Sequence, residues 1–188
     1  MGIYEFAGCV VSYEPLYGLL RRRMETYRSD TEGQPDITLD GTKEDYEKLR
    51  KQYPHLSIEE CEYSCAGAEF YMKLLKHQGF MIHASAVEKE GKAYLFSAPS
   101  GTGKSTHAQL WRQTFKGEPI RIINDDKPAV CLQNGVFYAC GTPFSGKTDK
   151  NENRKAPIQG LCMLHRGKTN KIQKITSGEA LPLILPQT

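Results

Sequence analysis

The clearest helical periodicity in the chain lies between residues 57 and 79. Apolar or small residues recur there every three or four positions, as on the buried face of one helix. We expect this stripe to contain Ile58, Cys61, Cys65, Ala68, Met72 and Leu75. Ser57 and Glu60 have the spacing of a capping box, and Gly79 stands where a C-terminal cap belongs. The pattern predicts one well-delimited helix, in which Cys61 and Cys65 are small core residues.

Short apolar runs separated by turn residues occupy much of the remaining chain. Residues 3–13 predict a strand or a hairpin arm, and residues 104–115 predict a helix closed by Gly117. Further strands are expected over residues 81–87, 92–97, 119–124, 129–132 and 136–139. If the turn at residues 88–91 closes a two-residue hairpin, His83 lies opposite Phe96. The pattern predicts an α/β fold with a mixed β-sheet.

Composition excludes several classes of protein. The 188 residues fit one domain, and 39% hydrophobic and 25% charged residues are typical of a globular protein. A formal net charge of +3 does not indicate nucleic-acid binding. No apolar run approaches the roughly 20 residues of a membrane span, and the N-terminus lacks a signal-peptide pattern, so we expect a cytoplasmic protein. The six cysteines form no C-x-x-C pair, which indicates neither zinc nor disulfides.

Residues 1–56 carry no motif of known chemistry. We expect an α/β segment that belongs to the same domain as the catalytic part, residues 57–188. Arg21, Arg22 and Arg23 form a basic run. We interpret this run as a solvated face rather than as a site for an anionic substrate.

A phosphate-binding loop is the strongest motif. It comprises Ala98, Pro99, Ser100, Gly101, Thr102, Gly103, Lys104, Ser105 and Thr106, which follow the Walker A pattern with alanine in place of the first glycine. Glycines there allow backbone N–H groups to turn toward phosphate oxygens at a helix N-terminus. Lys104 would reach the β and γ phosphates, and the Ser105 hydroxyl would bind magnesium. The sequence predicts a site for ATP and Mg²⁺.

Two carboxylates follow a predicted strand some twenty residues after Lys104. Asp125 and Asp126 stand where a neighbouring strand would bring them beside the phosphates. One carboxylate can hold magnesium while the other accepts a proton from an attacking hydroxyl. The predicted hairpin register also places His83 near the start of the loop, where it could orient a carboxylate or contact phosphate.

A second polar loop at residues 141–147 precedes a basic stretch. Lys147 and Arg154 are its candidate ligands for an anionic substrate or nucleotide. A solvated surface loop is the alternative.

Together these residues resemble the catalytic domain of HPr kinase/phosphorylase, a family structurally akin to ATP-dependent phosphoenolpyruvate carboxykinase. The resemblance covers about residues 79–157: first His83-Ala84-Ser85, next the segment from Ser100 to Thr106, and last Ile123-Asn124-Asp125-Asp126. Ala98-Pro99 replaces a more glycine-rich opening. Family members continue with further helices, so a C-terminally shortened or divergent member is expected.

The resemblance implies a P-loop domain of the HPr kinase/phosphoenolpyruvate carboxykinase type. It implies Asp125 as general base, Asp126 and Ser105 as magnesium ligands, Lys104 as phosphate ligand, and His83 as the group that orients Asp125. The implied function is transfer of the γ-phosphoryl group of ATP to a hydroxyl of a peptide, protein serine or small molecule. A carboxykinase-like enzyme, an ATPase and a non-catalytic nucleotide sensor are the alternatives. Relatives form rings or dimers, which leaves a homo-oligomer open.

Overall fold

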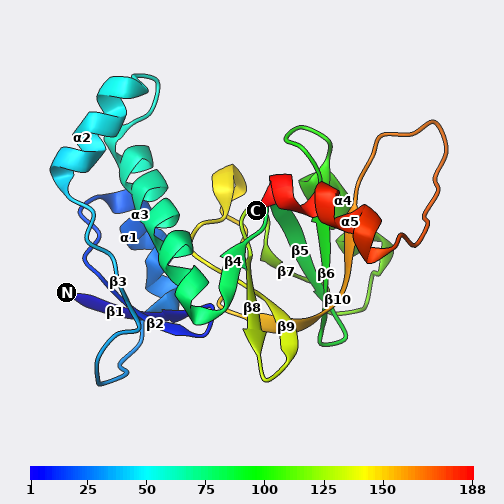
Figure 1. Cartoon of the computed structure of the whole chain (residues 1–188), viewed down its shortest axis with the longest axis horizontal. Coiled ribbons are helices and arrows are strands. Elements are labelled where there is room, and N and C mark those ends of the chain that lie inside the picture. Colours follow the sequence, from blue (N-terminus) through cyan, green and yellow to red (C-terminus); the bar gives the residue numbers. More distant parts are fainter.

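The structure, a computed structural model that describes residues 1–188, contains two β-sheets (Figure 1). The smaller sheet lies near the N-terminus and has the order β1-β2-β3. Its strands are β1 (Gly2–Phe6), β2 (Cys9–Tyr13) and β3 (Ile37–Thr38). β1 and β2 form an antiparallel hairpin, so residues 3–13 contain two strands where the sequence predicts a single strand or hairpin arm, and β3 runs parallel to β2.

Helices accompany this sheet at the left of Figure 1. They are α1 (Gly18–Met24), η1 (Glu25–Tyr27), α2 (Lys43–Gln52), α3 (Ile58–Leu74) and η2 (Leu75–His77). The capping box of Ser57 and Glu60 is confirmed at the start of α3. The expected cap at Gly79 is wrong, because Gln78 takes the left-handed conformation and Gly79 already begins a strand.

The predicted buried stripe of α3 is also wrong in phase. Met72 and Leu75 are exposed by 67% and 56%, and Ala68 is exposed as well. The face that packs inward instead contains Cys61, Glu62, Ala66, Gly67, Phe70 and Leu74. A buried carboxylate and a glycine interrupt the apolar pattern on this face, whereas the opposite side carries apolar residues that stay in solvent.

The larger sheet has seven strands in the order β4-β8-β9-β10-β6-β5-β7. Its strands are β4 (Gly79–Met81), β5 (Ala84–Lys89), β6 (Lys92–Ser97), β7 (Arg121–Asn124), β8 (Ala129–Gln133), β9 (Val136–Cys140) and β10 (Lys155–Met163). β10 pairs with β6 in parallel, and the other neighbours are antiparallel. The mixed α/β architecture is therefore as predicted.

Residues 81–87 do not form the single strand that the sequence predicts. The chain leaves the sheet at Ile82 and His83, so that β4 pairs with β8 while β5 pairs with β6 and β7. The turn between β5 and β6 is Glu90-Gly91, both with positive φ. Ser85 rather than His83 therefore lies opposite Phe96.

Helices cover parts of the larger sheet. α4 (Lys104–Thr114) follows β6 directly, and its Ala108 is buried with Val87, Phe96 and Ile122. α5 (Ser177–Ile184) and η4 (Leu185–Gln187) end the chain, and Ile184 packs on the cluster that includes Leu95 and Ile123. None of the helices combines the length and apolar character that crossing a bilayer requires.

One hydrophobic core joins the two sheets. Residues of β1, β2, α1 and α3 share it with Ala129, Cys131 and Cys140 of the larger sheet and with Phe144. Phe144 contacts the rings of Phe6 and Phe70 at centroid distances of 6.4 and 5.8 Å. η3 (Gly146–Thr148), the yellow turn in Figure 1, lies between the two parts.

Candidate functional site

The predicted phosphate loop connects β6 to α4, so a strand leads into it and a helix leads out. Gly101 and Gly103 have φ values of +77° and +115°, which L-residues rarely adopt. Lys104 begins the helix with its side chain turned inward, only 7% exposed, and its Nζ donates a hydrogen bond to the Ala98 carbonyl at 2.9 Å. The segment thus places two glycines at positive φ directly before a helix, and whether it binds phosphate stays a prediction.

The charge of Lys104 links this loop to the two aspartates. Burial lowers the pKa of Lys104, and the negative charges of Asp126 and Asp125 oppose that effect. A buried ammonium group requires nearby negative charge to remain stable. The pKa of Lys104 thus depends on the carboxylate pair that follows it about twenty residues later in the sequence.

Asp125 is buried and held by two hydroxyl groups. Ser85 Oγ donates to its Oδ1 at 2.6 Å, and Thr148 Oγ1 donates to its Oδ2 at 3.0 Å. Asp125 is only 3% exposed, and its peptide N–H donates a hydrogen bond to the Lys150 carbonyl. The expected partner His83 does not contact Asp125.

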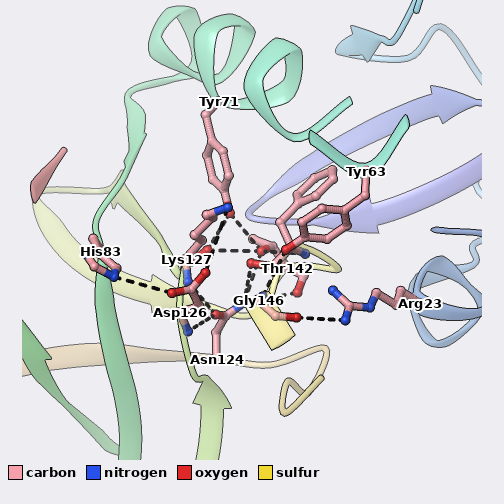
Figure 2. A network of polar contacts seen from close by, with 10 residues as sticks. Arg23, Tyr63, Tyr71, His83, Asn124, Asp126, Lys127, Thr142 and Gly146 are labelled. Carbon is pink, nitrogen blue, oxygen red and sulfur yellow. Dashed lines mark hydrogen bonds and ion pairs between the residues drawn. The ribbon is translucent and has the colours of Figure 1, made fainter. Parts of the chain in front are cut away.

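Asp126 is the aspartate that faces His83. His83 Nε2 lies 3.5 Å from Asp126 Oδ1, and Lys127 Nζ lies 3.9 Å from Oδ2 (Figure 2). Burial opposes ionisation of Asp126, but His83, Lys127 and Lys104 outweigh it and hold its pKa below the ordinary value. The expectation that His83 orients Asp125 is thus wrong. His83 was expected within a strand opposite Phe96, but it lies in the break before β5.

Asn124 fixes the turn that carries both aspartates. Its Oδ1 accepts hydrogen bonds from the peptide N–H groups of Asp126 and Lys127 at 3.0 and 2.9 Å. Its Nδ2 donates to the Thr142 carbonyl at 3.1 Å. Asparagine commonly caps a turn in this way. Sequence reasoning did not give Asn124 a role, although its position directly before the aspartates is a signal for one.

The Gly146–Thr148 turn packs against the same carboxylates from the other side. The Gly146 N–H donates to Tyr63 OH at 2.9 Å, and Arg23 Nη2 donates to the Gly146 carbonyl at 2.8 Å (Figure 2). Arg23 Nε also lies 3.0 Å from Asp149 Oδ1, within ion-pair distance but without hydrogen-bond alignment. Residues of α1 and α3 therefore hold the Gly146–Thr148 turn.

Arg23 corrects the interpretation of the basic run as a solvated face. Its side chain is 8% exposed, and its guanidinium lies 4.8 Å from the centre of the Tyr63 ring. Arg22 remains exposed, as expected. The helical turn of α1 separates neighbouring side chains by about 100°, so a run of three arginines presents different faces.

The two proposed substrate ligands lie in different surroundings. Lys147 is exposed within the Gly146–Thr148 turn. Arg154 instead makes a bidentate pair with Glu88, at 2.8 and 3.0 Å, and lines a cavity with Glu5, Arg28 and Lys155. The structure does not bring Arg154 to the carboxylate pair.

A further cation, Arg166, contacts the predicted phosphate loop. No pattern in the sequence predicts this contact. Arg166 follows β10, and its Nη2 donates to the Gly101 carbonyl at 2.6 Å. An open cavity of about 450 Å³ lies here, lined by Gly101, Thr102, Gly103, Thr106, His107, Leu110, Leu164, His165 and Arg166. Its size falls within the range of small-molecule sites.

The donors present fit magnesium. Ser105 and Asp126 offer oxygen atoms, the ligands that Mg²⁺ prefers, and Asp126 stays ionised because its pKa is depressed. No group of three or more His, Cys, Asp or Glu side chains forms a metal cage. Magnesium commonly binds through one or two protein oxygens, with waters and substrate phosphates completing its shell.

Comparison with known proteins gives little similarity. No family model and no curated protein matches the chain. Among solved structures, an HPr(Ser) kinase/phosphatase from Coxiella burnetii matches with 13% identity and a TM-score of 0.36, over 50% of this chain and 65% of that one. The match thus spans less than two thirds of that protein. A likeness this weak defines neither the fold nor the activity of this chain, whose function must be argued from its own residues.

Proposed function

We propose that this protein is an ATP- and Mg²⁺-dependent phosphotransferase that transfers the γ-phosphoryl group of ATP to a hydroxyl. The observation that carries the proposal is the position of Lys104, buried at the start of α4 and within the field of Asp125 and Asp126. This combination supplies a cation for the phosphates, a metal ligand and a proton acceptor.

The loop from Ala98 to Thr106 is proposed to bind the phosphates. Its glycines at positive φ allow successive N–H groups to face an anion, and the N-terminus of α4 adds favourable potential. Lys104 would neutralise the β and γ phosphates. Arg166, which donates to the Gly101 carbonyl, adds a second positive charge to the loop.

Ser105 and Asp126 are proposed to hold magnesium, which when bound neutralises the charge of the transferring phosphoryl group. His83 is assigned to Asp126 rather than to Asp125, since only Asp126 lies within reach. In this position His83 fixes the orientation of the metal-binding carboxylate.

Asp125 is proposed as the general base. A hydroxyl hydrogen already donates to its Oδ2 at 3.0 Å, which is the geometry that proton transfer from an acceptor requires. The Ser85 hydroxyl on Oδ1 fixes the carboxylate in that orientation. The acceptor is a peptide, protein serine or small molecule with a free hydroxyl.

The proposal is tested by following ADP formation from ATP and Mg²⁺ in the wild type and in Asp126→Asn. Asparagine keeps the shape of the side chain but removes the charge that holds magnesium. We expect slow ADP release by the wild type and a loss of about 10²-fold or more in the variant. Nucleotide binding with no turnover in either protein would favour a sensor, and phosphoenolpyruvate formation from oxaloacetate would favour a carboxykinase.

A further inference from the structure

The Thr148 hydroxyl donates to Asp125, the proposed general base. Two hydroxyl groups donate to Asp125, but they differ in access. Ser85 is fully buried within β5, whereas Thr148 is exposed at the end of the Gly146–Thr148 turn. Of these two hydroxyls, only that of Thr148 can meet a phosphoryl group arriving from solvent.

The turn is fixed against both carboxylates. A Cβ added at Gly146 would lie 2.6 Å from Asp126 Oδ2, so only glycine permits this approach. Tyr63 OH accepts a hydrogen bond from the Gly146 N–H, Arg23 donates to the Gly146 carbonyl, and Arg23 pairs with Asp149. Because Gly146 and Asp149 both have positive φ, the backbone reverses sharply around Thr148. The Thr148 hydroxyl is therefore held in place by contacts outside its own side chain.

The surroundings of Thr148 favour a polyanionic phosphate donor. Lys147 and Lys150 flank it and are both exposed. Asp149, the acid between them, already faces Arg23. Exposed lysines attract a nucleoside triphosphate at long range.

We propose that Thr148 is a self-phosphorylation site, the acceptor that this chain itself supplies. The inference rests on the proposed phosphotransferase function. Thr148 Oγ1 attacks the γ phosphorus of bound ATP and forms a new P–O bond. The bond between that phosphorus and the β–γ bridging oxygen breaks, ADP leaves, and the hydroxyl proton passes to Asp125 Oδ2.

The experiment incubates the full chain with ATP and Mg²⁺ and maps phosphate by mass spectrometry. We expect one phosphate on the peptide that contains residues 146–150, with a first-order rate constant unchanged over a tenfold dilution of protein, because the ATP site and the acceptor hydroxyl belong to the same chain. Thr148→Val removes the hydroxyl at almost constant shape and should lose this phosphate, and Thr148→Ser should restore it. Thr169→Val, in the exposed segment after β10, is the matched control and should be labelled as the wild type is.

The outcomes separate this inference from the proposed function. ADP formation without phosphate at residue 148, or labelling whose rate constant rises with protein concentration, overturns the inference and leaves the phosphotransferase. Labelling of Thr148→Val at wild-type level also overturns it. If the wild type neither binds ATP nor forms ADP, both proposals fail. Thermal unfolding of each variant shows that a lost phosphate does not reflect a lost fold.

Discussion

Asp125 and Asp126 are neighbours in sequence with different surroundings. Asp125 is closed in by Ser85 and Thr148, whereas Asp126 faces His83 and Lys127. The separation follows from Asn124, whose side chain binds the peptide N–H groups of Asp126 and Lys127 and turns the chain at this point. Adjacent carboxylates can thus take the two separate roles that phosphoryl transfer needs.

Lys104 gives a pH dependence at the residue scale. Burial lowers its pKa from 10.5, so it loses its charge at a lower pH than an exposed lysine does. Because the protonated form binds phosphate, we expect ATP affinity to fall as the pH rises through this lowered pKa, beginning below 10.5. Calorimetric titration of ATP from pH 7 to above 10.5 measures the effect. A flat affinity across that range would contradict the assignment of Lys104 as phosphate ligand.

Single residues also show where sequence reasoning stops. The glycine turn and the helix that begins at Lys104 could be predicted because both have local signals in the sequence. The contact of His83 with Asp126 could not be predicted. It depends on a strand break at Ile82 and on a hairpin register shifted by two residues from the expected one. Arg166 reaches Gly101 from 65 residues away, and no local pattern encodes that contact.

At the scale of elements, the Gly146–Thr148 turn connects the N-terminal helices to the site. Arg23 of α1 and Tyr63 of α3 hold Gly146, and Tyr27 OH donates to Asn151 Oδ1 at 2.5 Å just beyond the turn. Residues 1–56, to which the sequence assigns no chemistry, thereby supply groups that position the candidate site.

Replacement of Gly146 by alanine tests this packing. Gly146→Ala strains a positive φ and drives a methyl group into Asp126, while Gly91→Ala strains a similar φ of +72° with open space around it. We expect Gly91→Ala to lose about 1 kcal/mol of stability, and Gly146→Ala to lose more because of the added clash with Asp126. Only Gly146→Ala should also form less ADP and respond less to added Mg²⁺. Thermal unfolding measures the stability of the two variants, and turnover assays measure their ADP formation. Equal activity of the two variants would show that the turn does not shape the site.

The hydrophobic periodicity of α3 predicts the helix but not which of its faces is buried. The start of α3 was predictable because the capping box is local. Its buried face was not, because Glu62 is buried where it accepts hydrogen bonds from Tyr13 OH and the peptide groups of Leu16 and Tyr17. Gly67 is buried because the Phe144 ring lies directly against it. Both reasons are tertiary contacts.

At the scale of the whole molecule, the shared core predicts one cooperative unit. Phe144 is 1% exposed and joins aromatic residues of β1 and α3 to the larger sheet. The single tryptophan, Trp111, lies in α4 on the other part. We expect Phe144→Ala to destabilise the protein by about 3–5 kcal/mol. The unfolding transition of Trp111 fluorescence should shift together with that of circular dichroism. An unchanged Trp111 transition would mean that the two parts unfold independently.

Every role proposed above depends on the loop at Lys104 binding a nucleotide together with magnesium. Isothermal titration of ATP with and without Mg²⁺, in the wild type and in Lys104→Ala, measures this binding. We expect Mg²⁺-dependent binding by the wild type, and the loss of both this binding and the nucleotide-dependent thermal stabilisation in Lys104→Ala. Absence of binding by the wild type, or equal binding by the two proteins, would contradict this expectation.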